Sequence, residues 1–264
     1  MTDLLNVIHE DADLLVVNKP AGLVCHPTKQ DERSSLVGRA RLHLGPASRP
    51  HLVNRLDRET SGVVVIAKNP ESARQLGRIW ESRLVTKTYL AVVHGHPREN
   101  RGLIDAPLGR DEHSRVAIKD CVRPDGAPAR TEFMVEQRFT REAPLEPIPL
   151  PAQPSHVARL QPFALLRLTP HSGRKHQIRI HLAHFGHPIV GDKIYGGDED
   201  CYLALVENRL TSEQQARLIL PHHALHAAHV AFAWQDRLAQ FEAPAEPWFV
   251  QFWGMEAGEA SRLG

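Results

Sequence analysis

The charged segment "NRLDRETSG" at residues 54–62 stands directly before the apolar run "VVVIA" at residues 63–67. The apolar run is rich in β-branched residues and predicts a buried β-strand. A strand that meets solvent at so dense a set of charges restricts the fold, because charged groups need partners or water. Four charged residues are therefore expected at the mouth of this strand: Arg55, Asp57, Arg58 and Glu59.

Asp57 stands between Arg55 and Arg58, and this setting predicts an ionised carboxylate. Nearby positive charge favours the charged form of a carboxyl group, which suits a nucleophile or a charge stabiliser better than a general acid. The residues Thr60–Gly62 predict a tight turn that aims the preceding residues into a cleft. The alternative is a solvated loop whose charges pair with one another.

A second basic segment runs from Arg167 to Lys193, with Asp192 as its only acidic residue. Within it, "KHQIRIHLAHFG" predicts a helix with Ile178, Leu182 and Phe185 on one face, and Gly186 and Pro188 end it. Arg179 is expected half-buried at the flank of that face, with His176 as its neighbour. Arg174 and Lys175 lie at the helix N-terminus, where free backbone N–H groups attract anions. The segment therefore predicts phosphate binding, with a plain basic surface as the alternative.

The remaining patterns mix strands and helices irregularly, which favours the α+β class. The sequence predicts two strands around a turn at residues 10–13, a helix within 69–83 that begins at the cap Asn69 and Pro70, and further strands at 85–95, 163–169 and 223–234. The proline-rich segment 141–162 is interpreted as a loop excursion.

Composition narrows the class of protein. The 264 residues are 42% hydrophobic and have a net charge of +1, and no apolar run approaches the length needed to span a membrane. The three cysteines, Cys25, Cys121 and Cys201, form no C-x-x-C pair, so neither a disulfide framework nor a thiolate zinc site is indicated. A cytoplasmic protein is expected.

Two groups of histidines raise the question of a metal. They are His176, His181, His184 and His187, and His222, His223, His226 and His229. Only Asp192 stands near them as a further ligand, and strand alternation would send His226 and His229 to opposite faces. No metal site is predicted, and the histidines are expected to donate hydrogen bonds to backbone or phosphate groups.

Taken together, these segments resemble the RluA-type pseudouridine synthases. "NRLDRETSG" is similar to the family motif H-R-L-D-x-x-T-S-G, and "GRKHQIRIHLAHFGHPIVGDKIY" to its G-R-x-H-Q-x-R-x-H and G-H-P-I-x-G-D-x-x-Y blocks. "DLLVVNKPAGL", "KTYLAVVHG" and "ALHA" also match, so the resemblance covers residues from about 7 to 245 in the family's order. One departure is Asn54, which stands where the family usually has a histidine and can still donate and accept hydrogen bonds.

The resemblance implies that the protein isomerises uridine to pseudouridine in RNA. Asp57 would be the essential carboxylate and Arg179 its ion-pair partner. Tyr89 would stack under the uracil ring, and its hydroxyl would be a candidate to help remove the C5 proton. Arg55 would fill the space left by the flipped uridine. RNA contacts would come from Arg55, Arg58, Arg174, Lys175, His176 and Gln177. Whether Asp57 attacks the sugar, adds to the ring or removes a sugar proton stays open.

The resemblance further implies one α+β catalytic domain over residues 1–264, on a long, mostly antiparallel mixed sheet with a central basic cleft, and without a separate upstream RNA-binding domain. We expect a monomer that needs no cofactor, membrane or protein partner and acts on transfer or ribosomal RNA. Two alternatives are an RNA-binding protein without catalysis and a histidine-metal hydrolase. The first would lack the carboxylate or the tyrosine, and the second would lose activity to a chelator.

Overall fold

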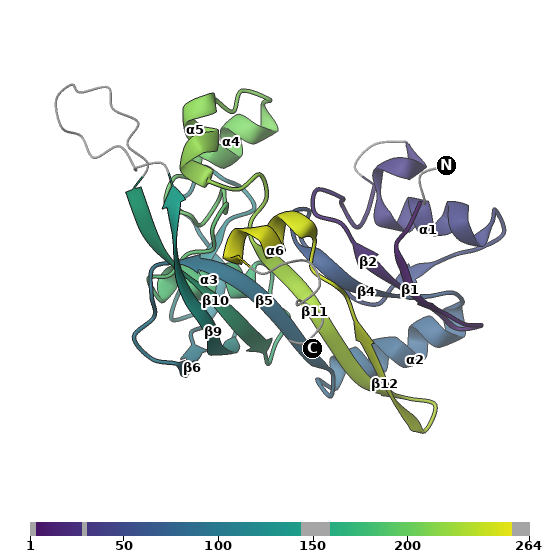
Figure 1. The fold of residues 1–264 in the computed structure, drawn as a ribbon. Coiled ribbons are helices and arrows are strands. Elements are labelled where there is room, and N and C mark those ends of the chain that lie inside the picture. Colours follow the sequence, from purple (N-terminus) through teal and green to yellow (C-terminus); the bar gives the residue numbers. More distant parts are fainter. Residues whose placement is uncertain (1–3, 28–30, 144–158, 255–264) are drawn as a thin grey trace. The chain divides into compact units, whose positions relative to one another are not determined.

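The computed structural model describes residues 4–27, 31–143 and 159–254 of the chain. The chain divides into two compact units, residues 1–89 with 225–264, and residues 90–224. Strand β5 (Thr86–His94) contributes residues to both units (Figure 1). The expectation of one catalytic domain over the whole chain stays a prediction.

The first unit is built on a mixed sheet with the strand order β1-β2-β4-β11, in which β3 also pairs with β4 and β12 with β11. All these pairs are antiparallel except β4 with β11, which are parallel. The strands are β1 (Val7–Glu10), β2 (Leu14–Lys19), β3 (His51–Leu52), β4 (Ser61–Ala67), β11 (Leu225–Trp234) and β12 (Arg237–Glu242). The predicted strand–turn–strand at the N-terminus and the strand at 63–67 are confirmed.

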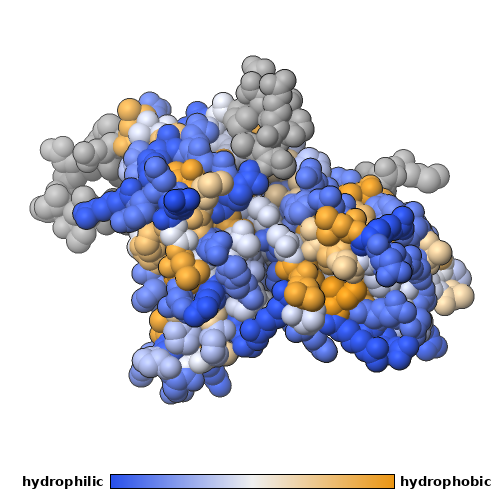
Figure 2. Space-filling model, turned by 90° about the horizontal axis from the view of Figure 1, so that it is seen from below, coloured by the Kyte–Doolittle hydropathy of each residue, from blue (hydrophilic) through white to orange (hydrophobic). Residues whose placement is uncertain are grey.

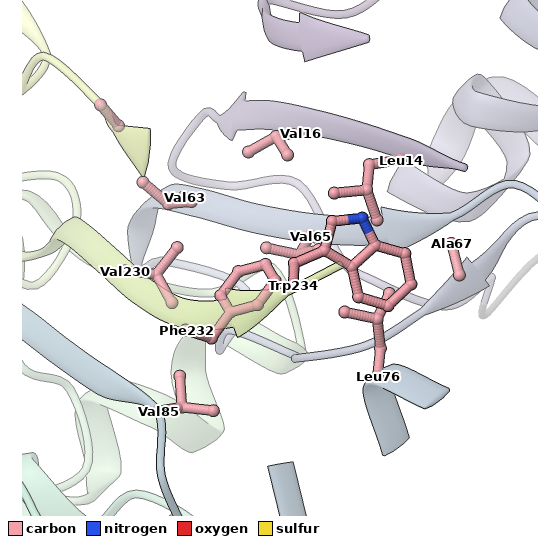
Figure 3. Close-up of a cluster of buried hydrophobic side chains, with 11 residues drawn as sticks. Leu14, Val16, Val63, Val65, Ala67, Leu76, Val85, Val230, Phe232 and Trp234 are labelled. Carbon is pink, nitrogen blue, oxygen red and sulfur yellow. The ribbon is translucent and has the colours of Figure 1, made fainter. Parts of the chain in front are cut away.

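Strands β2 and β4 are buried on both faces, which explains their continuous apolar runs. Successive side chains of a strand point to opposite faces. One face of the first unit's sheet, shown in Figure 3, therefore receives Leu14, Val16, Val63 and Val65, which pack with Phe232 and Trp234 of β11. Helix α2 (Pro70–Glu81) covers this face through Leu76, Ile79 and Trp80.

The opposite face of this sheet receives Leu15, Val17, Val64 and Ile66. It is covered by helix α1 (Leu36–Leu44), through Leu36, Ala40 and Leu44, and by residues from two loops and from β5: Leu23, Cys25, Leu56 and Tyr89. We call this the α1 face and the other the α2 face. The short helices η1 (Glu32–Ser34) and α6 (Pro247–Trp253) complete the described part of the unit.

The N-terminal signals of α2 act as predicted. The Asn69 side chain accepts a hydrogen bond from the Ser72 N–H at 2.8 Å, and Pro70 occupies the first helical position. The apolar positions then face the sheet, so that local sequence and packing agree at this helix.

The second unit has the antiparallel strand order β10-β9-β6 and a separate hairpin of β7 and β8. Its strands are β6 (Arg101–Asp105), β7 (Leu108–Arg110), β8 (Asp120–Val122), β9 (Arg130–Ala143) and β10 (Arg159–Pro170). Its helices are α3 (Gln177–His184), α4 (Asp200–Val206) and α5 (Ser212–Leu218). The helix predicted within 175–186 and the strand at 163–169 are confirmed.

The interpretation of 141–162 as a loop is wrong at both of its ends. Strand β9 continues to Ala143 and β10 begins at Arg159, with Gln161 opposite Arg141 and Pro162 opposite Thr140. The density of prolines hid this pairing, although a proline costs a strand only its own N–H donor. Residues 144–158, with five of the six prolines, lie outside the described residues.

The α+β class and the mostly antiparallel mixed sheet are thus confirmed, whereas the central basic cleft stays a prediction. On the face drawn in Figure 2, apolar patches lie among hydrophilic residues. Exposed large apolar side chains come from separate elements, such as Leu84, Leu103, Leu160 and Leu238, which is ordinary for a folded protein. Among the described residues no helix is both long and apolar enough to cross a bilayer.

Candidate active site

Asp57 lies in the loop between β3 and β4, and its neighbour Leu56 anchors that loop. The Leu56 side chain is 8% exposed and packs into the α1 face. Arg55 and Arg58 are exposed and Asp57 is half-buried. Burial of Leu56, the single leucine in "NRLDRETSG", therefore places the adjacent carboxylate at the edge of the core.

The predicted turn lies slightly earlier than expected. The Thr60 N–H donates to the Asp57 carbonyl at 3.2 Å, which closes a turn over Arg58 and Glu59. Ser61 and Gly62 already belong to β4. Gly62 is required there for two reasons: its φ is +113°, and a Cβ would lie 2.6 Å from the Ala227 nitrogen of β11. The small residues of the motif thus serve strand pairing.

Two buried side chains from residues 19–25 hold the backbone on both sides of Asp57. The Cys25 thiol and the Leu56 backbone are paired in both directions, with the Leu56 N–H donating to Sγ and the thiol donating to the Leu56 carbonyl, each at 3.4 Å. The Lys19 Nζ donates to the Arg58 carbonyl at 3.1 Å. These contacts restrain the backbone of the two residues that flank Asp57.

Lys19 is a site residue that sequence reasoning missed. It is 0% exposed, and its ammonium group also donates to the carbonyls of Pro20 and Leu23, both at 2.9 Å. Burial lowers the pKa of Lys19 to about 8, although the charges of Cys25, Glu246 and Asp57 oppose this shift. The available signal was a lysine that ends the buried run "LLVVN", a position where a charge needs dedicated partners.

Tyr89 lies on the α1 face, together with Leu56, and is half-buried. Burial raises the pKa of the Tyr89 phenol, and the negative charge of Asp57 raises it further. The phenol is therefore neutral at physiological pH. The structure thus brings together Asp57 and Tyr89, two of the three residues predicted to be catalytic.

Asn54, the departure from the family motif, joins the loop to β4. Its Oδ1 accepts from the Val65 N–H at 2.8 Å, and its Nδ2 donates to the Val63 carbonyl at 3.2 Å. Along β4, β11 pairs at Ser61 and Gly62, and β3 pairs at Ile66 and Ala67. The Asn54 amide therefore pairs with β4 as a strand would, in the gap between β11 and β3. The prediction that Asn54 donates and accepts hydrogen bonds is confirmed.

His226 fixes the start of β4 from the neighbouring strand. The ring is 0% exposed, with Nε2 2.9 Å from the Ala243 carbonyl and Nδ1 2.9 Å from the Ser61 hydroxyl. Burial lowers its pKa, so the ring is neutral, Nε2–H donates to the carbonyl and Nδ1 accepts from Ser61. The expected role of these histidines as backbone donors is confirmed at this position.

In the second unit, the turn before α3 presents the other predicted site residues. Arg174 and Lys175 are exposed, and the Lys175 ammonium group pairs with Asp120 at 2.9 Å. His176 precedes the helix in a left-handed conformation, with φ of 55°, and its Nδ1 lies 2.9 Å from the Tyr195 hydroxyl. It is the N-cap and not a helical neighbour of Arg179.

Gln177 is buried, and its amide is engaged within the protein. Its Oε1 accepts from the Ser172 hydroxyl and the Arg174 N–H, while its Nε2 donates to the Arg130 carbonyl and the Thr131 hydroxyl. In the structure Gln177 fixes the turn that carries Arg174. Contact of these four residues with RNA stays a prediction.

Arg179 is more deeply buried than the predicted half-buried position, with 5% exposure. Its guanidinium forms a bidentate pair with Asp192, at 2.7 Å from Nε to Oδ2 and 2.8 Å from Nη2 to Oδ1, and lies 5.0 Å from the Tyr195 ring centre. Burial alone would raise the pKa of Asp192, but Arg179 lowers it below its ordinary value. Asp192 therefore holds Arg179 in one orientation.

Asp57 belongs to the first unit and Arg179 to the second, so their ion pair stays a prediction. In the parts of the chain that the structure describes, no three or more His, Cys, Asp or Glu side chains are placed to bind one metal ion together. The three cysteines are unpaired thiols.

The fold is that of the pseudouridine synthase class. The solved structure titled Human RNA Pseudouridylate Synthase Domain Containing 1 matches with a TM-score of 0.68 and 26% identity, over 93% of this chain and 85% of that one. Residues 13–184 match the family described as RNA pseudouridylate synthase, and the chain belongs to this family.

Two curated bacterial relatives agree. An uncharacterized RNA pseudouridine synthase of Aquifex aeolicus is 37% identical over 73% of this chain and 56% of its own length. The ribosomal large subunit pseudouridine synthase D of Xanthomonas campestris is 38% identical over 73% of this chain and 52% of its own length. The chain thus matches little more than half the length of these relatives.

Proposed function

We propose that this protein is an RNA pseudouridine synthase that acts through Asp57. The observation that carries the proposal is a carboxylate held by its backbone and close enough to Tyr89 for its charge to raise the pKa of the phenol, in a chain that belongs to this family. In the reaction the bond from uracil N1 to the sugar breaks and a bond from C5 forms. The C5 proton leaves and N1 gains a proton, so the product is an isomer of the substrate and no oxidant or co-substrate is consumed.

The surroundings of Asp57 suit each of the three roles that remain open for it, because all need an oriented carboxylate. For Tyr89 the structure favours one role over another. A phenol with a raised pKa is a poor acceptor for the C5 proton but keeps its apolar ring and its O–H donor. We infer that Tyr89 stacks on the uracil and that the proton leaves to another group or to water.

The second half of the proposed site is Arg179, which would reach Asp57 from its buried pair with Asp192. An arginine held by one carboxylate keeps further N–H donors for a second one. The bidentate pair would therefore fix the guanidinium in place for Asp57 without exhausting its donors.

The substrate we propose is large-subunit ribosomal RNA. This assignment is supported by the similarity to the ribosomal large subunit pseudouridine synthase D of Xanthomonas campestris. Transfer RNA is the alternative substrate of the same reaction.

The decisive experiment is the Asp57→Asn variant. The amide keeps the size of the side chain but loses its charge and nucleophilicity, so pseudouridine formation in a large-subunit ribosomal RNA transcript should be abolished. RNA affinity should persist, because phosphate contacts supply most of it. The measurement is pseudouridine mapping after incubation with the purified protein, with transfer RNA transcripts in parallel.

Glu81→Gln is the matched control, since it makes the same chemical change at an exposed residue of α2. It should leave the rate unchanged. If Asp57→Asn turns over at a tenth of the parent rate or faster, Asp57 is not the essential carboxylate. If the parent modifies neither class of RNA, the substrate assignment is wrong.

A further inference from the structure

Positive charge is concentrated in a segment of the first unit that extends beyond the predicted site residues. Residues 33–58 contain six arginines and a single acidic residue, Asp57. Two of the arginines, Arg55 and Arg58, flank Asp57. The others lie in η1, in α1 and in the loop that follows, so they need a separate explanation.

Helix α1 begins beside the Asp57 loop. The Leu36 N–H donates to the Val24 carbonyl at 2.8 Å, and the Val37 N–H donates to the Cys25 carbonyl at 3.1 Å. Cys25 in turn holds the Leu56 backbone through its thiol. The N-terminal turn of α1 and the loop that carries Asp57 are therefore attached to the same short segment.

Four arginines lie on the two parts of the chain attached to this segment, and we call them the arginine rim: Arg33, Arg39, Arg55 and Arg58. The Arg39 Nε donates to the Arg33 carbonyl at 2.8 Å, and Arg39 lines a cavity of about 200 Å³ together with Pro20 and Leu23. The Arg58 Nε donates to the Gly22 carbonyl at 3.2 Å. Arg55 lies close enough to Cys25 for its positive charge to oppose the rise that burial causes in the pKa of this thiol.

The charges of the arginine rim are not neutralised by the carboxylates around them. Among the described residues, none of the four forms an ion pair with a carboxylate. The nearby acids are used elsewhere: Glu32 pairs with Arg41, Asp31 caps η1, and Glu246, which lines the same cavity as Arg39, accepts from the Ala21 N–H. By contrast, Arg123 in the second unit is paired with both Glu112 and Asp125.

We propose that Arg33 and Arg39 form, with Arg55 and Arg58, a phosphate-binding surface for the RNA strand that flanks the target uridine. Arg33, Arg55 and Arg58 are exposed and Arg39 is partly exposed, so their guanidinium groups can meet a ligand. Unpaired guanidinium groups bind phosphate through paired N–H donors. The inference rests on the proposed function for its partner, and it adds η1 and α1 to the RNA interface.

The test compares two double variants with the same loss of charge. Arg33→Gln with Arg39→Gln removes the two rim arginines of η1 and α1 and leaves the residues around Asp57 in place. Arg74→Gln with Arg78→Gln changes two exposed arginines of α2, which covers the opposite face of the same sheet. The dissociation constant for a uridine-containing RNA hairpin is measured from 50 to 300 mM salt.

The rim variant should bind more weakly than the parent at every salt concentration. The slope of log K against log salt should become shallower by about 1.4–1.8, because each lost phosphate contact removes about 0.7–0.9. The α2 variant should match the parent in both quantities. Equal slopes for the two double variants would overturn the proposal, since the effect would then be one of net charge alone.

Two further measurements separate the possible causes. Arg33→Lys with Arg39→Lys keeps the charges and should retain the parent slope; a slope as shallow as that of the Gln variant would show that the changes act through the fold of α1. The single-turnover rate of the α2 variant should equal that of the parent, because Arg74 and Arg78 lie outside the proposed surface. The hairpin affinity is measured without turnover. The binding test therefore remains interpretable even if Asp57→Asn shows that the proposed function is wrong.

Discussion

At the scale of single residues, each unit contains a buried charge that has dedicated partners. Lys19 has three backbone carbonyls as acceptors, and Asp192 has Arg179 and two backbone N–H groups. A buried charge without such partners would cost several kcal/mol. These residues therefore contribute to both orientation and stability, and the two contributions can be measured separately.

The first prediction concerns Lys19→Met and pH. The folded-state pKa of Lys19, about 8, lies below its ordinary value of 10.5, so unfolding takes up a proton between these pH values. The parent should therefore gain stability relative to the variant as pH rises from about 8 to about 10, by at most about 3 kcal/mol. Below pH 8 the difference should be constant. Urea unfolding of both proteins at several pH values measures it, and parallel pH profiles would contradict the prediction.

The second prediction concerns the pair of Arg179 and Asp192. Arg179→Ala leaves a buried carboxylate without its partner and should lower the free energy of unfolding by about 3–5 kcal/mol. Arg179→Lys should recover only part of this loss, because an ammonium group cannot form the bidentate pair. Thermal and urea unfolding are the measurements.

The control for Arg179 is Arg130→Ala, which breaks the exposed pair with Asp105 in the same unit. It should cost less than about 1 kcal/mol. If the two Ala variants were equally stable, Arg179 would not depend on burial for its role.

At the scale of elements, β4 is the strand around which the first unit is organised. It pairs with β2 along one edge, and on the other it meets β11, the Asn54 amide and β3 in turn. Because all seven residues of β4 are buried, each backbone group on both edges needs a partner. The loop that carries Asp57 is thus part of the pairing of this strand.

The third prediction follows for Asn54→Ala. The variant leaves the Val65 N–H and the Val63 carbonyl without side-chain partners, and a buried unpaired polar group costs about 1–3 kcal/mol. The free energy of unfolding should fall by this amount, and pseudouridine formation should slow because the loop is less restrained. Asn54→Leu, which has similar volume, should not restore stability; if it does, the side chain only fills space.

At the scale of the whole molecule, a net charge of +1 coexists with locally concentrated positive charge. Such segregation suits a ligand with a charged backbone, because the local field and not the total charge attracts it. The proposed reaction adds a demand of its own, since a stacked uridine must leave its neighbours before it can react.

The fourth prediction concerns Arg55→Ala and the extrusion of the uridine. If the exposed Arg55 side chain fills the vacated space, the variant should slow the reaction most where the uridine is stacked in a helix. A target in a loop costs less to extrude and should be less affected. Single-turnover rates on one target sequence in both contexts test this, and equal losses would assign Arg55 to phosphate binding alone.

Much of the fold could be predicted from local patterns in the sequence. The run "VVVIA" and the cap Asn69 with Pro70 predicted a buried strand and a helix start, because backbone sterics and orphan N–H groups act over a few residues. The order of the motifs indicated the family, and the family resemblance assigned Asp57 and Tyr89 to the same catalytic site. The local proline pattern gave a wrong prediction at Arg141 and Gln161. There, long-range strand pairing overrides the preference of prolines for loops.

By itself, then, the sequence determined which residues are chemically special: the carboxylate among arginines, the tyrosine and the basic helix. Only the tertiary structure decided their partners. Lys19 donates to the Arg58 carbonyl, and Arg179 forms a buried ion pair with Asp192. The Asn54 side chain accepts from the Val65 N–H, as a neighbouring strand would. The physical reason is that a buried polar group must be satisfied by whatever packing brings within about 3 Å, and residues far apart in sequence supply that partner only once the core has formed.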